Sequence, residues 1–137
     1  MHIKLIALSA FSLFFLTSCD DSNVLVNFYD KQLKSKKLNC LSYIPESNNT
    51  LDTALTKLYK FSKECPYTLE LSYKSNIVCH SPYNVPLKVN SNFPSAYIKL
   101  EVRKGYKLEY SYYKDLTHKA NLSDLKEAFD RLKSDIL

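Results

Sequence analysis

Glycine is almost absent from the 137-residue chain, with Gly105 as its single occurrence. Phosphate-binding loops and dinucleotide-binding turns need several closely spaced glycines, so both are excluded. The G-x-S-x-G, H-E-x-x-H and C-x-x-C patterns of hydrolases and metal sites are also missing. Basic residues outnumber acidic ones by 19 to 14, and this small, evenly spread surplus does not indicate nucleic-acid binding. We therefore predict a protein that is not an enzyme and that has no cofactor and no metal site.

The amino-terminal segment has the pattern of a signal peptide. His2 and Lys4 form a short basic start, and residues 5–16 form an apolar run broken only by serine. This run is too short to cross a bilayer, which requires about 20 residues, but it suits the apolar core of a signal peptide. The run ends in the sequence LTSC at residues 16–19, which resembles the lipobox of bacterial lipoproteins.

The resemblance implies a lipid anchor on Cys19. In bacterial lipoproteins the thiol of this cysteine receives a diacylglyceryl group, and a signal peptidase cuts just before it. Residues 1–18 would then be removed, and residues 19–137 would form a single periplasm-facing domain held at the membrane by acyl chains. In an enterobacterial host, Asp20, followed by Asp21, resembles the signal that retains lipoproteins in the inner membrane. The alternative is an ordinary secretory signal with a chance cysteine.

The other three cysteines are Cys40, Cys65 and Cys79, and they predict one disulfide and one spare thiol in an oxidising compartment. A hairpin expected at residues 67–81 would place Cys65 roughly 20 Å from Cys79, whereas disulfide Cα atoms lie within about 7 Å. Cys40 is therefore expected to pair with either Cys65 or Cys79. Catalysis by Cys79 is not expected, because the adjacent His80 would point to the opposite face of a strand.

Hydrophobic periodicity predicts three helices. Residues 23–38 have a weak helical spacing, and a clear apolar stripe over residues 51–64 predicts a helix capped by Asn49 or Thr50. Asn121 is expected to cap the last helix. The apolar stripe of that helix comprises Leu122, Leu125, Ala128, Phe129, Leu132 and Ile136.

Two antiparallel hairpins are predicted. In the first, a strand over residues 67–73 returns over 77–81 through a turn at 74–76, with Asn76 in the left-handed conformation. This register places Tyr73 opposite Ile77 and Leu71 opposite Cys79. Residues 38–44, nearer the amino terminus, fit either a short strand or an irregular segment.

The second hairpin is expected over residues 96–113, with a three-residue loop that ends at Gly105. The predicted apolar pairs are Val102 with Tyr106, Leu100 with Leu108, and Ile98 with Tyr110. The predicted outer pairs are Glu101 with Lys107 and Lys99 with Glu109. The complete prediction is an α+β fold, a four-stranded antiparallel meander with helices packed on one face.

Two surfaces are candidates for protein binding. The first is the long, proline-containing connection over residues 80–95, since long connections are often functional. Its apolar candidates are Tyr83, Val85, Leu87 and Phe93. The alternative is that this connection forms an edge strand and that Phe93 fills the core. The second surface is the outer sheet face around Tyr97 and Tyr113, because tyrosine among alternating charges suits an interface, although it also suits a solvated sheet.

The expected function is that of a non-enzymatic envelope lipoprotein that binds another envelope protein or an incoming protein. Immunity, exclusion and inhibitor lipoproteins form this class. The alternative is a structural accessory lipoprotein of an envelope secretion or conjugation assembly. Four lysines close behind the anchor fit either contacts with anionic headgroups or a solvated helix face. They are Lys31, Lys34, Lys36 and Lys37.

Overall fold

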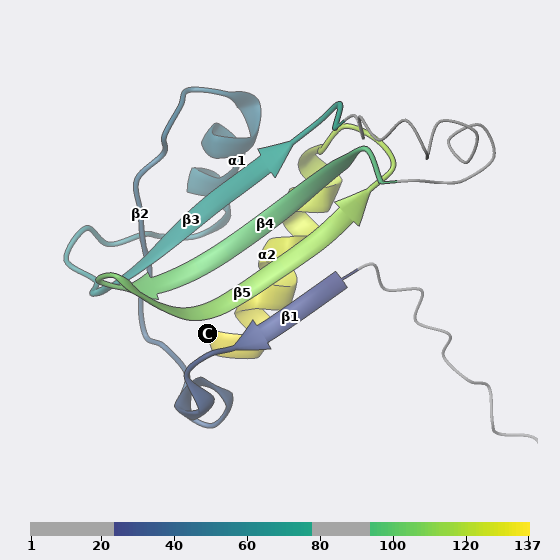
Figure 1. Ribbon diagram of the computed structural model, residues 1–137. Helices are drawn as coiled ribbons and strands as arrows, with labels where there is room; N and C mark the ends of the chain where they lie inside the picture. Colours follow the sequence, from purple (N-terminus) through teal and green to yellow (C-terminus); the bar gives the residue numbers. More distant parts are fainter. Residues whose placement is uncertain (1–23, 78–93) are drawn as a thin grey trace, which may run out of the picture.

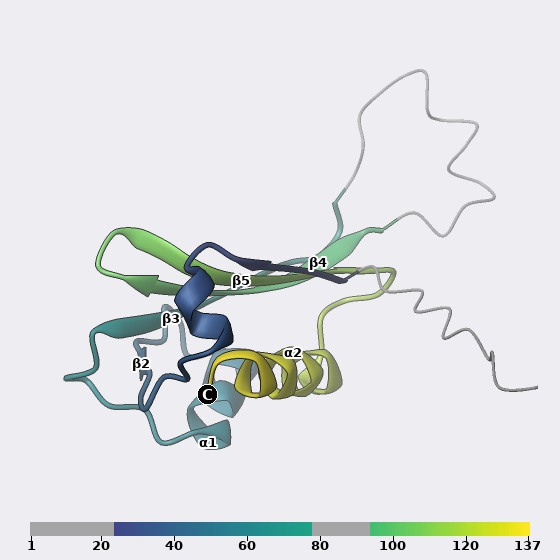
Figure 2. The ribbon, with the colours of Figure 1, turned by 90° about the horizontal axis from the view of Figure 1, so that it is seen from below.

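The computed structural model describes residues 24–77 and 94–137. A five-stranded mixed sheet has the order β1-β5-β4-β3-β2 (Figure 1). Its strands are β1 (Val24–Phe28), β2 (Ser42–Tyr43), β3 (Tyr67–Lys74), β4 (Ala96–Lys104) and β5 (Lys107–Leu116). The helices are the 3-10 helix η1 (Lys31–Lys34) and the α-helices α1 (Thr50–Leu58) and α2 (Leu122–Ile136). Both α-helices lie on the same side of the sheet, which confirms the α+β class (Figure 2).

The four-stranded meander is wrong, because β3 pairs directly with β4. Leu71 lies opposite Leu100 and Tyr73 lies opposite Ile98, so the predicted pair of Tyr73 with Ile77 does not form. The long-range partner keeps apolar side chains together on the covered face of both strands. Pairing of β3 with the more distant strand β4 is therefore more favourable than the predicted local hairpin, because the ladder is longer and its apolar faces match.

The chain continues along β3 instead of reversing direction. The backbone amide of Ile77 donates to the carbonyl of Ser95 (2.8 Å), which carries the contact between these two segments beyond the end of β3. Asn76 has the predicted left-handed conformation, with φ of 59°. The remainder of the predicted return strand lies outside the described residues.

The second hairpin forms between β4 and β5, but its predicted register is wrong. The turn contains two residues, with Gly105 at its first position and at φ of 59°. Val102 faces Tyr110, four positions beyond the predicted Tyr106 (110 − 106), and the other two predicted pairs are displaced in the same way. A bulge in β5 leaves Glu109 without a partner on β4. This extra residue restores the match of apolar faces that an unbroken two-residue hairpin would lose.

The helix predicted over residues 23–38 is wrong in its first half, which forms the edge strand β1. Val24, Val26 and Phe28 are half-buried on the covered face, and Leu25 between them is 63% exposed. The ring of Phe28 packs edge to face on Tyr110 of β5, at 5.3 Å between centroids. Pairing with β5 makes this two-residue alternation more favourable than the weak helical spacing.

Helix α1 is capped by Asn49, as predicted, but it ends at Leu58 and does not continue to residue 64. Tyr59 adopts an extended conformation at the end of the helix. The extended chain brings Phe61 to within 6.3 Å of Phe129 and 5.3 Å of Tyr43, measured between ring centroids. Aromatic packing against α2 and β2 thus ends the helix early.

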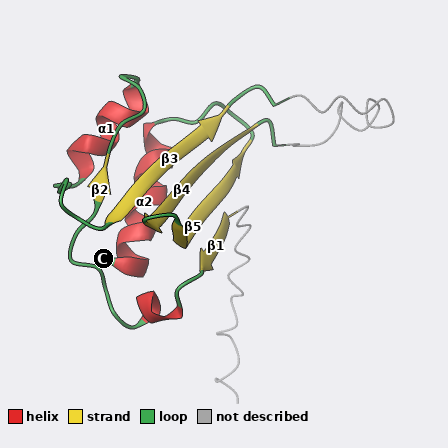
Figure 3. Ribbon diagram, turned by 60° about the vertical axis from the view of Figure 1, so that its left-hand side comes forward, coloured by secondary structure: helices red, strands yellow, loops and turns green. Residues whose placement is uncertain are grey.

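The short strand β2 resolves the open prediction for residues 38–44. It runs parallel to β3, with Ser42 beside Thr68 and Tyr43 beside Leu69. Helix α1 connects the two parallel strands, and Figure 3 shows β1 and β2 at opposite edges of the sheet.

Helix α2 begins at the predicted cap Asn121, whose side chain forms a reciprocal capping box with Asp124. Leu122 is 52% exposed, so its predicted place in the apolar stripe is wrong. The buried stripe of α2 comprises Leu125, Ala128, Phe129, Leu132 and Ile136. On the sheet, the buried residues of the covered face include Leu69, Leu71, Ile98, Leu100, Val102, Tyr110 and Tyr112.

Candidate functional site

Most of the predicted site residues lie outside the described part of the chain. They are Cys19, Asp20, Asp21, Cys79, Tyr83, Val85, Leu87 and Phe93. The predictions that rest on them therefore stay predictions. The structure describes the remaining candidates, which are two cysteines and the two tyrosines of the outer sheet face.

A disulfide joins Cys40 to Cys65, with Cα atoms 5.9 Å apart and a sequence separation of 25. This is one of the two pairings that the sequence left open. The pairing follows from the parallel alignment of β2 and β3, because each cysteine precedes its strand by two residues. Closing a loop of this length stabilises the fold by about 3 kcal/mol on the chain-entropy model.

Tyr97 and Tyr113 alternate along β4 and β5 with the buried residues of the covered face, so they lie on the opposite, bare face of the sheet. Both α-helices lie on the other side (Figure 2). Their rings stack, with centroids 5.5 Å apart and planes 26° apart. On the next strand, Leu25 lies directly beside Tyr113 and is 63% exposed. We call these three side chains the tyrosine patch. They form a rigid, partly apolar surface that spans three strands.

The hydroxyl of Tyr113 donates to Oδ1 of Asp115 (2.8 Å). Partial burial first, and the neighbouring carboxylate second, raise the pKa of Tyr113 to about 12. Tyr113 therefore stays neutral at physiological pH, and its ring orientation is held by the hydrogen bond.

Beyond the tyrosine patch, the bare face carries a chain of ion pairs. Glu101 accepts from Lys99 (2.9 Å) and from Arg103 (3.0 Å), and Arg103 also donates to Glu70 on β3 (2.9 Å). Desolvation of Glu101 favours its neutral acid, but the hydrogen bonds and charges of its two partners outweigh this effect and lower its pKa. The chain of charges links β3 to β4 and leaves Glu101 ionised.

The predicted cross-strand pairs of the second hairpin are wrong. The register shift moves Lys107 away from Glu101 and moves Glu109 away from Lys99. Lys107 instead pairs along its own strand with Glu109, at 3.1 Å between nitrogen and oxygen.

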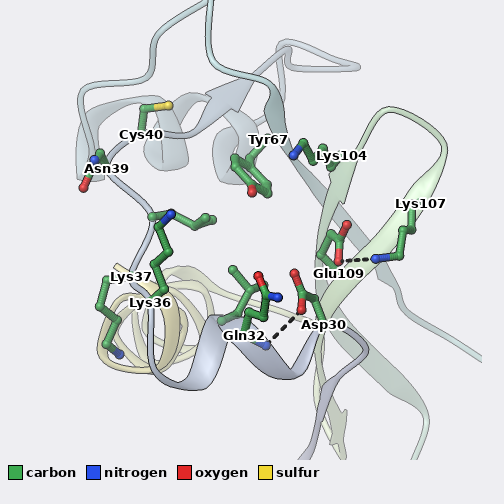
Figure 4. Close-up of a pocket in the computed structure, with 12 residues that line it drawn as sticks. Asp30, Gln32, Lys36, Lys37, Asn39, Cys40, Tyr67, Lys104, Lys107 and Glu109 are labelled. Atoms are coloured by element: carbon green, nitrogen blue, oxygen red, sulfur yellow. Dashed lines mark hydrogen bonds and ion pairs between the residues drawn. The ribbon is translucent and has the colours of Figure 1, made fainter.

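A cavity of about 590 Å³ opens at the end of the sheet that carries the β4–β5 turn (Figure 4). The segment over residues 30–40 forms one side, and the ends of β3, β4 and β5 form the other. Its charged lining residues are Lys36, Lys37, Lys104 and Lys107, together with Asp30 and Glu109. Four ammonium groups against two carboxylates give the lining a net charge of +2 (4 − 2).

Several of these charges already have partners within the protein. Glu109 is 3% exposed and is paired with Lys107. The ammonium of Lys37 donates to the carbonyls of Ser134 and Asp135 (2.7 Å each) and so caps the carboxyl end of α2. The contacts of Lys37 attach the segment over residues 30–40 to the carboxyl end of α2.

No cluster of three or more histidine, cysteine, aspartate or glutamate side chains suited to a metal occurs within residues 24–77 and 94–137. Near the end of β5, Asp115 accepts from Tyr113, while Nδ1 of His118 lies 3.0 Å from the carbonyl of Lys119.

Sequence reasoning identified Tyr97 and Tyr113 but missed Leu25, the third member of the tyrosine patch, and the cavity. Basic residues are concentrated over 31–37 and 103–107 in the printed sequence, and this is the one signal of the cavity that a reader of the sequence has. Their meeting depends on how the segment after β1 lies against the β4–β5 turn. Local periodicity contains no information about that long-range contact.

Comparison with models of known protein families, with curated proteins and with solved structures found no match. A separate property concerns membrane insertion. Each helix in the described ranges is too short or too polar to span a bilayer.

Proposed function

We propose that the protein is a membrane-anchored envelope lipoprotein that acts by binding another protein, as immunity, exclusion and inhibitor lipoproteins do. The observation that carries this proposal is the tyrosine patch on a bare sheet face. Rigid aromatic side chains lose little conformational entropy on binding and are enriched in protein interfaces. No catalytic step is part of the proposed activity.

The position of the patch suits a protein held at a membrane. Strand β1, which contributes Leu25, begins five residues after Cys19 (24 − 19), the cysteine of the lipobox sequence. The Cys40–Cys65 disulfide is typical of proteins in an oxidising compartment, which supports a periplasm-facing domain. In an enterobacterial host, Asp20 would retain the protein in the inner membrane.

The connection over residues 80–95 is part of the proposal as a second contributor to the same surface. Ile77 and Ser95, which flank it, are hydrogen-bonded neighbours at the start of β4. Tyr97 follows two residues later (97 − 95). Tyr83, Val85, Leu87 and Phe93 lie outside the described residues, and their contribution to binding is a proposal from the sequence.

The anchor is tested by Cys19→Ala in the full chain. We expect the variant to lose labelled palmitate and to leave the membrane fraction, while the unchanged chain keeps both. Membrane retention with normal palmitate incorporation in the variant would contradict the lipoprotein assignment. In an enterobacterial host, Asp20→Ser should move the protein to the outer membrane, and an unchanged distribution would contradict inner-membrane sorting alone.

Binding is tested by site-specific photo-crosslinking in living cells. A photoreactive phenylalanine analogue replaces Tyr97 or Tyr113, and the same analogue at Lys126, an exposed position of α2, is the control. We expect one discrete adduct from the patch positions and none from the control. Failure of both patch positions to form an adduct, or equal adducts from all three, would contradict the proposal.

The alternative function, a structural accessory of a secretion or conjugation assembly, is separated by a deletion strain. Loss of protection against an incoming toxin or plasmid supports the binding role in defence. Loss of assembly of the envelope machinery supports the accessory role.

A further inference from the structure

The cavity and the tyrosine patch lie at opposite ends of the sheet. Strand β4 begins beside the patch and runs nine residues to Lys104 at the cavity. Seven residue steps lead from Tyr97 to Lys104 (104 − 97), and at about 3.4 Å per residue they separate Tyr97 from the cavity by roughly 24 Å. Strand β1 leads in the same direction, from the end nearest Cys19 toward Asp30 at the cavity wall. The cavity therefore opens at the end of the domain that is remote from the proposed anchor.

Two ammonium groups of the cavity lining have no carboxylate partner within residues 24–77 and 94–137. They belong to Lys36 and Lys104, both of which are exposed. The Nζ of Lys104 lies over the ring of Tyr67, 5.4 Å from its centroid, and the side chain is exposed to solvent. Figure 4 shows Lys36 and Lys104 on opposite walls of the same hollow.

Of the two carboxylates in the lining, Glu109 has an ion-pair partner among the described residues, whereas Asp30 accepts only from a backbone amide and keeps its negative charge. Glu109 is paired with Lys107, and Oδ1 of Asp30 accepts from the backbone amide of Gln32 (2.9 Å). Figure 4 shows the hydroxyl of Tyr67 pointing into the hollow, toward Gln32. The cavity thus offers two unpaired cations and a phenol donor to an incoming acceptor.

We infer that this cavity binds a carboxylate side chain on an acidic segment of the partner protein. The inference rests on the proposed function and adds the chemistry of the partner. Two ammonium groups together with a neutral donor suit a carboxylate, because its oxygens accept several charge-assisted hydrogen bonds. The volume of about 590 Å³ exceeds that of a single small anion and accommodates an acidic side chain with the residues beside it. A lipid headgroup is disfavoured as the source of the anion because the anchored end of the domain is at the other end of the sheet.

The test measures binding of a fluorescein-labelled peptide that contains four consecutive glutamates, with the matching glutamine peptide as its neutral control. The full chain is purified from membranes in mild detergent. We expect the glutamate peptide to bind and the glutamine peptide to bind at least tenfold more weakly. Replacement of both free cations, in Lys36→Gln/Lys104→Gln, should weaken binding of the glutamate peptide by at least tenfold.

The matched control is Lys57→Gln/Lys126→Gln, which removes two exposed lysines that lie on α1 and α2 outside the cavity. Both double variants lower the net charge by the same amount, so they differ only in where the charge is removed. Because Lys57 and Lys126 lie outside the cavity, the control should change the affinity for the glutamate peptide by less than twofold. Equal weakening in the two double variants would overturn the inference, since it would show a general effect of charge. Unchanged binding in Lys36→Gln/Lys104→Gln would overturn it as well.

Two further probes identify the source of the anion. Inorganic phosphate and vesicles containing phosphatidylglycerol are tested with the same variants. The inference would be overturned in favour of a lipid headgroup if the vesicles bind in a way that depends on Lys36 and Lys104 while the glutamate peptide does not bind. The crosslinking and palmitate experiments do not involve these lysines, so a failure of the cavity is distinguishable from a failure of the proposed function.

Discussion

The same strands form two very different faces of the sheet, one apolar and covered by the helices, the other charged and bare. On β4, Ile98, Leu100 and Val102 point to the helices and are completely buried. The residues that alternate with them carry charge on the bare face, where Glu101 bridges Lys99 and Arg103. Because successive side chains of a strand point to opposite faces, one nine-residue strand contributes to both surfaces.

The comparison separates folding from binding. Burial of apolar area on the covered face supplies most of the favourable free energy of folding, since exposed ion pairs contribute little. The bare face is therefore free to carry the tyrosine patch and the ion pairs without a large effect on stability. Substitutions on adjacent residues of one strand should have very unequal effects.

The largest expected effect comes from Leu100→Ala, compared with its neighbour Lys99→Ala. Leu100 is 0% exposed, and its truncation should lower the free energy of unfolding by about 2 to 5 kcal/mol through lost burial and a residual cavity. Lys99→Ala removes one partly exposed ion pair and should change the free energy of unfolding by less than about 1 kcal/mol. Urea denaturation of the two variants measures both values, and equal losses would show that the two faces do not differ in this way.

The covered face was the part of the fold that local sequence patterns predicted best. The stripe of α2 and the alternation of Tyr67, Leu69 and Leu71 both reflect burial of one face of an element. Burial patterns of this kind appear within one segment. They predict which side chains point inward without information about the partner strand.

The pairing of strands was not predictable from the same patterns. The two-residue turn at residues 105–106 and the bulge at Glu109 together shift the β4–β5 register, and β3 pairs with β4. Several registers keep apolar residues on one face, and the choice among them depends on long-range packing. The edge strand β1 was missed for the same reason, because it is stabilised by contact with β5.

The candidate sites also differ in whether local sequence patterns or long-range contacts determine them. Tyr97 and Tyr113 were identified because they alternate with inward-facing residues on two adjacent strands. The cavity joins Lys36, which follows η1, to Lys104 at the end of β4. Residues so far apart in the chain come together only through the tertiary fold, so a sequence pattern cannot pair them.

A smaller effect, with opposite signs on the two faces, is expected from Tyr112→Phe and Tyr113→Phe. Tyr112 is 1% exposed, and its hydroxyl has no hydrogen-bond partner among the described residues. Removal of this buried group should raise the free energy of unfolding by about 1 kcal/mol. Tyr113→Phe loses the hydrogen bond to Asp115 and should lower it by about 1 kcal/mol.

Thermal and urea denaturation of these two variants in one buffer measure the difference. Burial raises the pKa of Tyr112 to about 12, and burial together with Asp115 raises the pKa of Tyr113 to the same value. Both phenols are therefore neutral near pH 7, and ionisation does not enter the comparison. Destabilisation by Tyr112→Phe equal to that by Tyr113→Phe would contradict the absence of a partner for the Tyr112 hydroxyl.

The smallest expected effect concerns the charge of Glu101 on the bare face. Glu101→Gln keeps the size of the side chain and removes its charge, and should lower the free energy of unfolding at pH 7 by less than about 1 kcal/mol. Since its partners lower the pKa of Glu101 below the ordinary value of 4.5, the folded state binds protons less readily than the unfolded chain. The stabilisation is therefore present above about pH 4.5 and is lost as the pH falls through the lowered pKa.

The control for this charge effect is Glu64→Gln, at an exposed glutamate that has no ion pair within the described ranges. Urea denaturation between pH 3 and pH 7 measures the free energy of unfolding of both variants and of the unchanged chain. The gap between the unchanged chain and Glu101→Gln should narrow as the pH falls, and Glu64→Gln should show no such gap. The gap should also shrink in about 1 M salt, because exposed charges are screened over a few ångströms there. A gap that widens toward acid pH, or one that salt leaves unchanged, would mean that the side chain of Glu101 acts through packing instead of charge.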